Sequence, residues 1–216
     1  MSDSQLGFRD DASPTTPGAL DDAGVASLIT ALYNVRRNPS LWEEWVHRLS
    51  GLLGGAAVLL ALGYRRSDDG ICVVSAEIDL AYRQRYARHY HAHDPWVERA
   101  QGRPAGVVGF GYEWLPRPLL IQSAFYSEWL KPQGLQPTPC IRGVLLTDGA
   151  RPVATVSIFR RHGGPALGIA ELARMRGLMP HLQRAVRADQ RIMVRGGTYR
   201  CASANPSAPQ KDGAGE

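Results

Sequence analysis

The stretch YRQRYARHYHAHDPW, residues 82–96, combines tyrosines, histidines and an aspartate at spacings that suit a helix. Tyr82, Tyr86 and Tyr90 recur every four residues, so on a helix they would share one face. A phenol buries a flat apolar ring and keeps a hydroxyl that needs a partner, which suits the wall of a binding site for a partly polar small molecule. An ordinary core stripe is the simpler alternative, because aromatic stripes at this spacing mostly pack cores.

Asp94, at the end of this stretch, has two roles open to it. Ahead of Pro95 it would act as the N-cap of a short new helix, because Asp is favoured at the N-cap and Pro at the first helical position. In a low-dielectric site beside the tyrosines, the same carboxylate would offer a strong acceptor to an N–H group of a ligand. The two roles are compatible.

The histidines of the stretch raise two further hypotheses. His89 and His93 are four residues apart and could bind one metal ion, but no third convergent ligand and no HExxH motif is present. An acid–base pair of His89 and Asp94 would make the protein an enzyme, yet the chain lacks GxSxG, Walker and strand-linked GxGxxG motifs. Histidines near a helix C-terminus are explained by its partial negative charge. We therefore predict no metal, no cofactor and no catalytic activity.

Composition excludes several partner classes. The 25 basic residues give a net charge of +5 but are scattered, so we predict no direct binding of nucleic acid by this chain. DNA contact by arginines of the last predicted helix is the alternative, although a solvated helix face explains them more simply. These are Arg176, Arg184, Arg187 and Arg191. No apolar run reaches the roughly 18 residues of a membrane span, and no signal peptide is evident, so we predict a cytoplasmic protein.

Periodicity predicts both helices and strands. Helices are expected at 23–36, from a Ser40–Glu43 capping box onward, at 118–130 and at 167–193. Strands are expected at 56–64, 71–78, 139–147 and 152–160, forming two antiparallel hairpins. This order predicts an α+β fold, an antiparallel β-sheet flanked by helices with a long C-terminal helix, which suits a GAF- or PAS-like sensory domain.

One domain, residues 21–194, is expected between two disordered ends. Residues 1–20 and 195–216 are rich in small polar residues and cannot bury enough apolar surface to order themselves. The last predicted helix carries a narrow apolar seam, which could pair with a second copy or cover the sheet, and Pro180 would kink it. We favour dimerisation. The seam consists of Leu172, Met175, Met179, Leu182 and Val186.

Three segments together resemble the N-terminal sensory domains of LuxR-type helix-turn-helix transcriptional regulators, over residues 25–193. They are the tyrosine stretch with its Asp-Pro-Trp step, AFYSEWLKPQGL at 124–135 and GPALGIAELARMRGLMPHLQRAV at 164–186. In the branch that binds acyl-homoserine lactones, an aromatic pair lines the pocket and an aspartate accepts the ligand's amide N–H. Tyr82 and Tyr86 resemble that pair and Asp94 that aspartate, although Tyr82 stands where Trp is usual and the spacing to Asp94 is shorter.

The resemblance implies a sensory domain that binds a small organic ligand or a protein partner, modulates transcription and forms a homodimer or assembles with a partner regulator. LuxR-type regulators read DNA through a C-terminal unit, whereas a Gly/Pro/Ser-rich tail follows residue 194 here, so a truncated or stand-alone regulator is expected. A dimerisation or interaction module without a ligand is the alternative. The ligand-binding residues expected beyond Tyr82, Tyr86, Tyr90 and Asp94 are Trp96, Trp114, Phe125 and Trp129.

Overall fold

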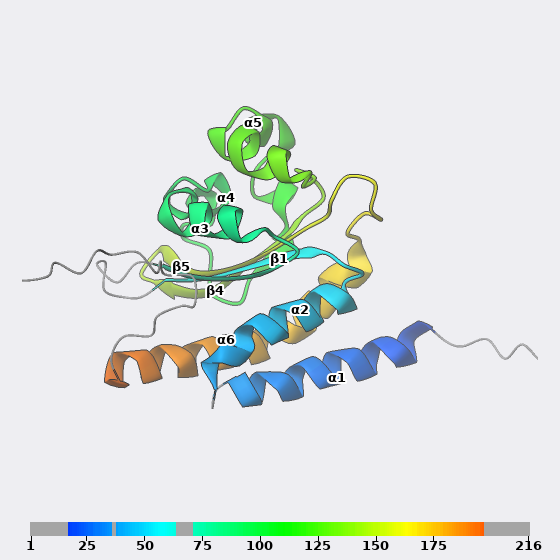
Figure 1. The fold of residues 1–216 in the computed structure, drawn as a ribbon, viewed down its shortest axis with the longest axis vertical. Helices are drawn as coiled ribbons and strands as arrows, with labels where there is room; N and C mark the ends of the chain where they lie inside the picture. The colour runs from blue at the N-terminus through cyan, green and yellow to red at the C-terminus, as the bar shows by residue number, and fades with distance from the viewer. Residues whose placement is uncertain (1–16, 36–37, 64–70, 197–216) are drawn as a thin grey trace, which may run out of the picture.

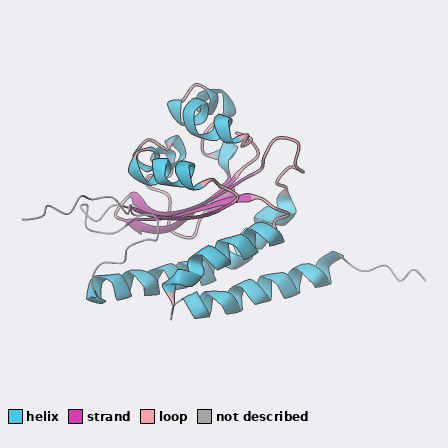
Figure 2. Ribbon diagram, viewed as in Figure 1, coloured by secondary structure: helices cyan, strands magenta, loops and turns pink. Residues whose placement is uncertain are grey.

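The computed structural model describes residues 17–35, 38–63 and 71–196. A five-stranded antiparallel sheet lies between two layers of helices, with strand order β2-β1-β5-β4-β3 (Figures 1 and 2). This confirms the predicted α+β class and the long C-terminal helix. Most of the two ends expected to be disordered lies outside the described residues. Within the described part, no helix combines the length and the apolar character needed to cross a membrane.

The four predicted strands are present, and each predicted hairpin is antiparallel. The hairpins join because β1 also pairs with β5, with Leu59 opposite Ser157. A fifth strand of three residues at the β4 edge was not predicted, because so short a segment shows no periodicity. The strands are β1 (Ala57–Gly63), β2 (Ile71–Ala76), β3 (Val108–Phe110), β4 (Ile141–Asp148) and β5 (Arg151–Phe159).

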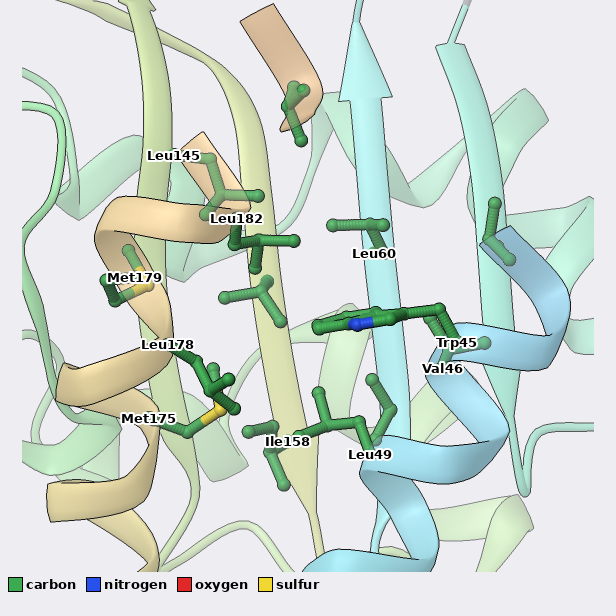
Figure 3. Close-up of a cluster of buried hydrophobic side chains, with 14 of the residues drawn as sticks. Trp45, Val46, Leu49, Leu60, Leu145, Ile158, Met175, Leu178, Met179 and Leu182 are labelled. Carbon is green, nitrogen blue, oxygen red and sulfur yellow. The ribbon is translucent and has the colours of Figure 1, made fainter. Parts of the chain in front are cut away.

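Three long helices form the layer on one side of the sheet, with α1 on the outer side of α2 and α6 (Figure 1). Trp45 of α2 lies over the sheet near Leu60 and Ile158 (Figure 3). Its indole Nε1 donates to the carbonyl of Leu28 at 3.1 Å, which fixes α1 to α2. The helices are α1 (Pro17–Val35), α2 (Trp42–Leu52) and α6 (Ile169–Gly196).

The start of α2 differs from the predicted capping box. Leu41, at the end of the 3-10 turn η1 (Pro39–Leu41), is the N-cap and makes no side-chain cap bond. The Ser40 hydroxyl donates instead to the side-chain oxygen of Asn38 at 2.6 Å. The capping-box prediction is therefore wrong, because the serine is engaged by a residue before the helix.

The apolar seam of α6 faces the sheet of its own chain, and the helix continues through Pro180. All five seam residues are buried in the core beneath the sheet. Met175, Met179 and Leu182 point toward the strands in Figure 3. This corrects the expectation that the seam pairs with a second copy, because the surface it would offer is already covered.

Short helical segments form the layer on the other side of the sheet. The predicted helix 118–130 is broken there, because the Ser123 hydroxyl donates to the carbonyl of Leu120 at 2.6 Å and accepts from the N–H of Tyr126 at 3.2 Å. The segments are α3 (Leu80–Arg88), η2 (Tyr90–Ala92), α4 (Pro95–Arg99), η3 (Gly111–Glu113), α5 (Arg117–Ile121), the π-helical η4 (Tyr126–Leu130) and η5 (Lys131–Gln133). Together they are called the α3–α5 layer.

Candidate functional site

The expected ligand-binding residues gather between the sheet and the α3–α5 layer. Tyr82 is half-buried at the margin, and all the others are buried. The tyrosine helix ends at Arg88, so Tyr90 lies in the next turn, yet its ring still faces inward with that of Tyr86. Trp114 belongs to the same core but lies beneath the guanidinium of Arg103, 4.7 Å from its ring centre.

Interlocking rings make up what we call the aromatic cluster: Tyr86, Tyr90, Trp96, Phe125, Trp129 and Phe159. Phe125 stacks on Trp129 with centroids 5.1 Å apart, and Trp96 meets Phe125 edge-on at 6.2 Å. Trp129 also donates from Nε1 to the carbonyl of Tyr82 at 2.9 Å, which fixes α3 to η4. Such pairs add stability beyond the area they bury.

Asp94 lies within this cluster and is almost fully buried. Its Oδ1 accepts from the backbone N–H of Trp96 at 2.9 Å, which confirms the predicted N-cap of α4. Its Oδ2 accepts from the hydroxyl of Tyr86 at 3.0 Å and from Nη2 of Arg142 at 2.7 Å. The pKa of Tyr86 lies well above its ordinary value, mainly because the hydroxyl is buried and also because Asp94 is negatively charged. This hydroxyl therefore stays protonated and remains a donor.

Arg142 of β4 is the residue of the site that sequence reasoning missed. Its side chain is only 2% exposed and forms a buried ion pair with Asp94. The guanidinium also lies 4.8 Å from the ring centre of Trp96 and 5.9 Å from that of Phe159. Burial lowers the pKa of Arg142, but Asp94, Tyr86 and Cys140 together outweigh this effect and the pKa is raised. An arginine within the otherwise apolar run CIRGVLL was the available signal.

Two serines extend the polar part of the site across the sheet. Ser75 of β2 and Ser157 of β5 both lie opposite Leu59, and Ser157 also lies opposite Arg142. Alternation along each strand places all three polar side chains on the face toward the α3–α5 layer. We call Ser75, Ser157 and Arg142 the polar row.

Each member of the polar row has a buried polar atom without a hydrogen-bond partner in the described part of the chain. The atoms are Oγ of Ser75, Oγ of Ser157 and Nη1 of Arg142. A buried polar atom left unpaired costs free energy, and native proteins contain few of them. The row therefore keeps hydrogen-bonding capacity inside an otherwise apolar interior.

The histidines do not form a metal site in the described part of the chain, where no group of three His, Cys, Asp or Glu side chains could hold an ion. The rings of His89 and His93 stack at 4.5 Å, and Nδ1 of His93 lies 3.0 Å from the carbonyl of His89. At the rim, the Tyr90 hydroxyl donates to Oε2 of Glu128 at 2.7 Å.

The backbone of Gly111 packs closely against Trp96 of the aromatic cluster and against Cys140. Its carbonyl accepts from Nε1 of Trp96 at 2.9 Å, and its N–H donates to the carbonyl of Cys140 at 2.8 Å. A Cβ atom here would collide with Sγ of Cys140 and lie 3.0 Å from Nε1 of Trp96. Burial raises the pKa of this thiol to about 12, so Cys140 remains an uncharged packing group.

We expect Gly111→Ala to lower the free energy of unfolding by about 1–3 kcal/mol, because the methyl group overpacks the site beneath Trp96. Denaturant unfolding followed by circular dichroism would measure the change. Gly51→Ala is the matched control, since nothing lies within 4 Å of its Cβ position on α2. An equal loss of stability in both variants would contradict the packing argument.

Comparison with known proteins shows similarity in fold alone. No protein-family model and no curated protein matches the sequence. The LBD domain of VqsR from Pseudomonas aeruginosa superposes with a TM-score of 0.50 and 14% identity, covering 79% of this chain and 96% of that one. CepR2 from Burkholderia cenocepacia, an N-acylhomoserine lactone dependent LuxR family transcription factor, gives 0.50 and 17%, covering 81% and 99%.

Proposed function

We propose that this chain is a cytoplasmic sensory domain of the LuxR type, which binds a small organic ligand between the sheet and the α3–α5 layer and thereby modulates transcription. The fold it shares with the LBD domain of VqsR and with the N-acylhomoserine lactone dependent CepR2 supports this proposal. Assembly with a second copy or a partner regulator belongs to the proposal, through a surface other than the buried seam of α6. No catalytic step is part of it.

The observation that carries the proposal is the buried Asp94–Arg142 pair within the aromatic cluster. Removing two charges from water costs several kcal/mol per ion, and apolar side chains of similar volume often replace such a pair at no loss of stability. Unpaired atoms in the polar row add to this cost. Polar groups that do not stabilise the fold are expected where a protein recognises a ligand.

Strand β4 offers a physical route from the site to the opposite helix layer. Arg142 of β4 faces the aromatic cluster, whereas its neighbour Gly143 faces α6, where a Cβ atom would lie 3.3 Å from Met179. Gln183 of α6 also donates from Nε2 to the carbonyl of Leu145 at 3.0 Å. A ligand that binds more tightly when β4 is in one position would favour the packing of α6 that accompanies this position. The difference between the ligand's affinities for the two states sets the size of the shift.

Entry of a ligand requires movement of the α3–α5 layer, because side chains of the chain itself cover the cluster. A ligand that binds only the native state stabilises it by RT ln(1 + L/Kd), where L is the ligand concentration, so the melting temperature rises with the logarithm of ligand concentration once this exceeds Kd. We expect N-octanoyl-homoserine lactone, or a small molecule retained by the purified protein and identified by mass spectrometry, to produce such a shift.

Tyr86→Phe tests where the ligand binds. Loss of one hydroxyl that holds Asp94 in place should weaken affinity by roughly five- to tenfold, as expected for about 1 kcal/mol. Tyr33→Phe, at a tyrosine of α1 that is 51% exposed, is the control and should bind normally. Equal affinities of the two variants, or no retained molecule and no thermal shift, would favour an interaction module without a ligand.

A further inference from the structure

The proposed function does not specify which polar groups the ligand carries. The hydrogen bonds of Asp94 restrict this choice. An ionised carboxylate has about four acceptor positions. Three donors of the protein already use three of them: the N–H of Trp96, the hydroxyl of Tyr86 and Nη2 of Arg142. The guanidinium also compensates the negative charge that would attract an N–H group of a ligand. Asp94 therefore has little capacity left for a ligand donor.

Arg142 has the opposite property, because its Nη1 is buried without a hydrogen-bond partner among the described residues. A guanidinium carries five N–H donors in one plane. The guanidinium carbon lies over the aromatic rings of Trp96 and Phe159, and this cation–π contact does not use up the N–H groups. The free hydrogen-bonding capacity at this end of the site is therefore that of a donor.

Ser157 and Ser75 continue this pattern across the sheet. Ser157 lies on the strand next to Arg142 and Ser75 two strands farther, so at about 4.8 Å per strand the row extends for roughly 14 Å. Both hydroxyls are buried without partners in the described chain, and a hydroxyl can donate to an oxygen acceptor. A line of donors of this length suits an elongated molecule with more than one oxygen acceptor.

The charge of the ligand follows from the ion pair. Asp94 and Arg142 together are neutral, so a bound carboxylate would leave an excess negative charge in the interior, and an ammonium group would be repelled by the guanidinium. A carbonyl oxygen accepts a hydrogen bond without bringing a charge. Neutral ketones, esters and lactones meet both requirements.

We propose that Arg142, assisted by Ser157, recognises a carbonyl oxygen of a neutral ligand, and that the ligand needs no N–H donor for Asp94. This inference rests on the proposed function and specifies the ligand class of the same site. Where an aspartate accepts an amide N–H, the ligand is the donor. Here Arg142 of β4 already donates to Asp94, so the protein is the donor and the ligand is the acceptor.

A matched pair of probes tests the inference: N-octanoyl-homoserine lactone and α-octanoyloxy-γ-butyrolactone, in which an ester oxygen replaces the amide N–H. Isothermal titration of the full chain should give affinities equal within about threefold, because Asp94 has little acceptor capacity left for the N–H and its charge is compensated by Arg142. Octanoate, a charged acceptor, should bind at least about tenfold more weakly than the ester.

Variants of Arg142 and Ser157, two members of the polar row, test which side chains donate to the ligand. Asp94→Asn combined with Arg142→Met removes both charges together and should lower affinity for the ester by about tenfold or more. Ser157→Ala should weaken binding by roughly fivefold without lowering the melting temperature, because its hydroxyl has no partner to lose. Ser127→Ala, at an exposed serine of η4, is the control and should bind normally.

Each contrary result has a distinct meaning. An amide that binds at least about tenfold tighter than the ester would show that Asp94 accepts an N–H, and would overturn this inference while leaving the proposed function intact. The inference also fails if the double variant and Ser157→Ala bind the ester as the unchanged protein does, or if octanoate binds best. Absence of binding by every probe would overturn both this inference and the acyl-lactone form of the proposed function.

Discussion

Asp94→Ala is expected to lower the free energy of unfolding by about 3–5 kcal/mol, a large part of the roughly 5–15 kcal/mol that stabilises a typical domain. The change leaves the charge of Arg142 buried without its partner, which is the main cost. It also removes the acceptor of the Tyr86 hydroxyl and the N-cap of α4. Urea unfolding followed by circular dichroism and tryptophan fluorescence would measure the loss.

Two comparisons separate the buried charge from a general effect of substitution. Glu43→Ala breaks the ion pair with Arg83, in which the side chains are 53% and 15% exposed, and should cost no more than about 1 kcal/mol. Asp94→Asn with Arg142→Met removes both charges and should recover most of the stability lost in Asp94→Ala. The argument fails if Asp94→Ala and Glu43→Ala have similar effects.

The local part of the fold could be predicted from the sequence, and the long-range part could not. Each hairpin follows from apolar strands flanking a polar turn, a pattern contained in about twenty residues. The pairing of β1 with β5 unites segments about a hundred residues apart, and nothing within either strand specifies its partner. The break at Ser123 was missed because a hydroxyl that bonds to nearby backbone competes with the helix without disturbing its apolar period.

The candidate site also contains residues that could be predicted from the sequence and residues that could not. Tyr86 and the Asp94–Pro95 cap were predictable because spacing and capping preferences act within one short segment. Arg142 was overlooked because its partner Asp94 lies 48 residues earlier, and an arginine in a strand is normally exposed. The seam of α6 was assigned to the wrong partner because a narrow apolar stripe has the same sequence pattern whether it covers a sheet or pairs with another helix.

Leu182→Asp tests whether the apolar seam of α6 packs against the sheet of its own chain. Leu182 is fully buried beneath the sheet, and an unpaired carboxylate there should lower the free energy of unfolding by more than about 4 kcal/mol. We expect loss of the cooperative thermal transition in this variant. Arg184→Asp, at an exposed position of the same helix, introduces the same side chain and should change stability by about 0.5 kcal/mol or less.

An intermolecular seam would give a different result for the same variant. If Leu182 packed against a second copy, the carboxylate would separate the two copies and leave each one folded, with half the mass in sedimentation and a normal circular dichroism spectrum. A seam within the chain predicts unfolding, with a loss of stability that is the same over a roughly hundredfold range of protein concentration. A folded Leu182→Asp protein of halved mass would therefore reject the packing of α6 against its own sheet, and with it the route from Arg142 through β4 to this helix.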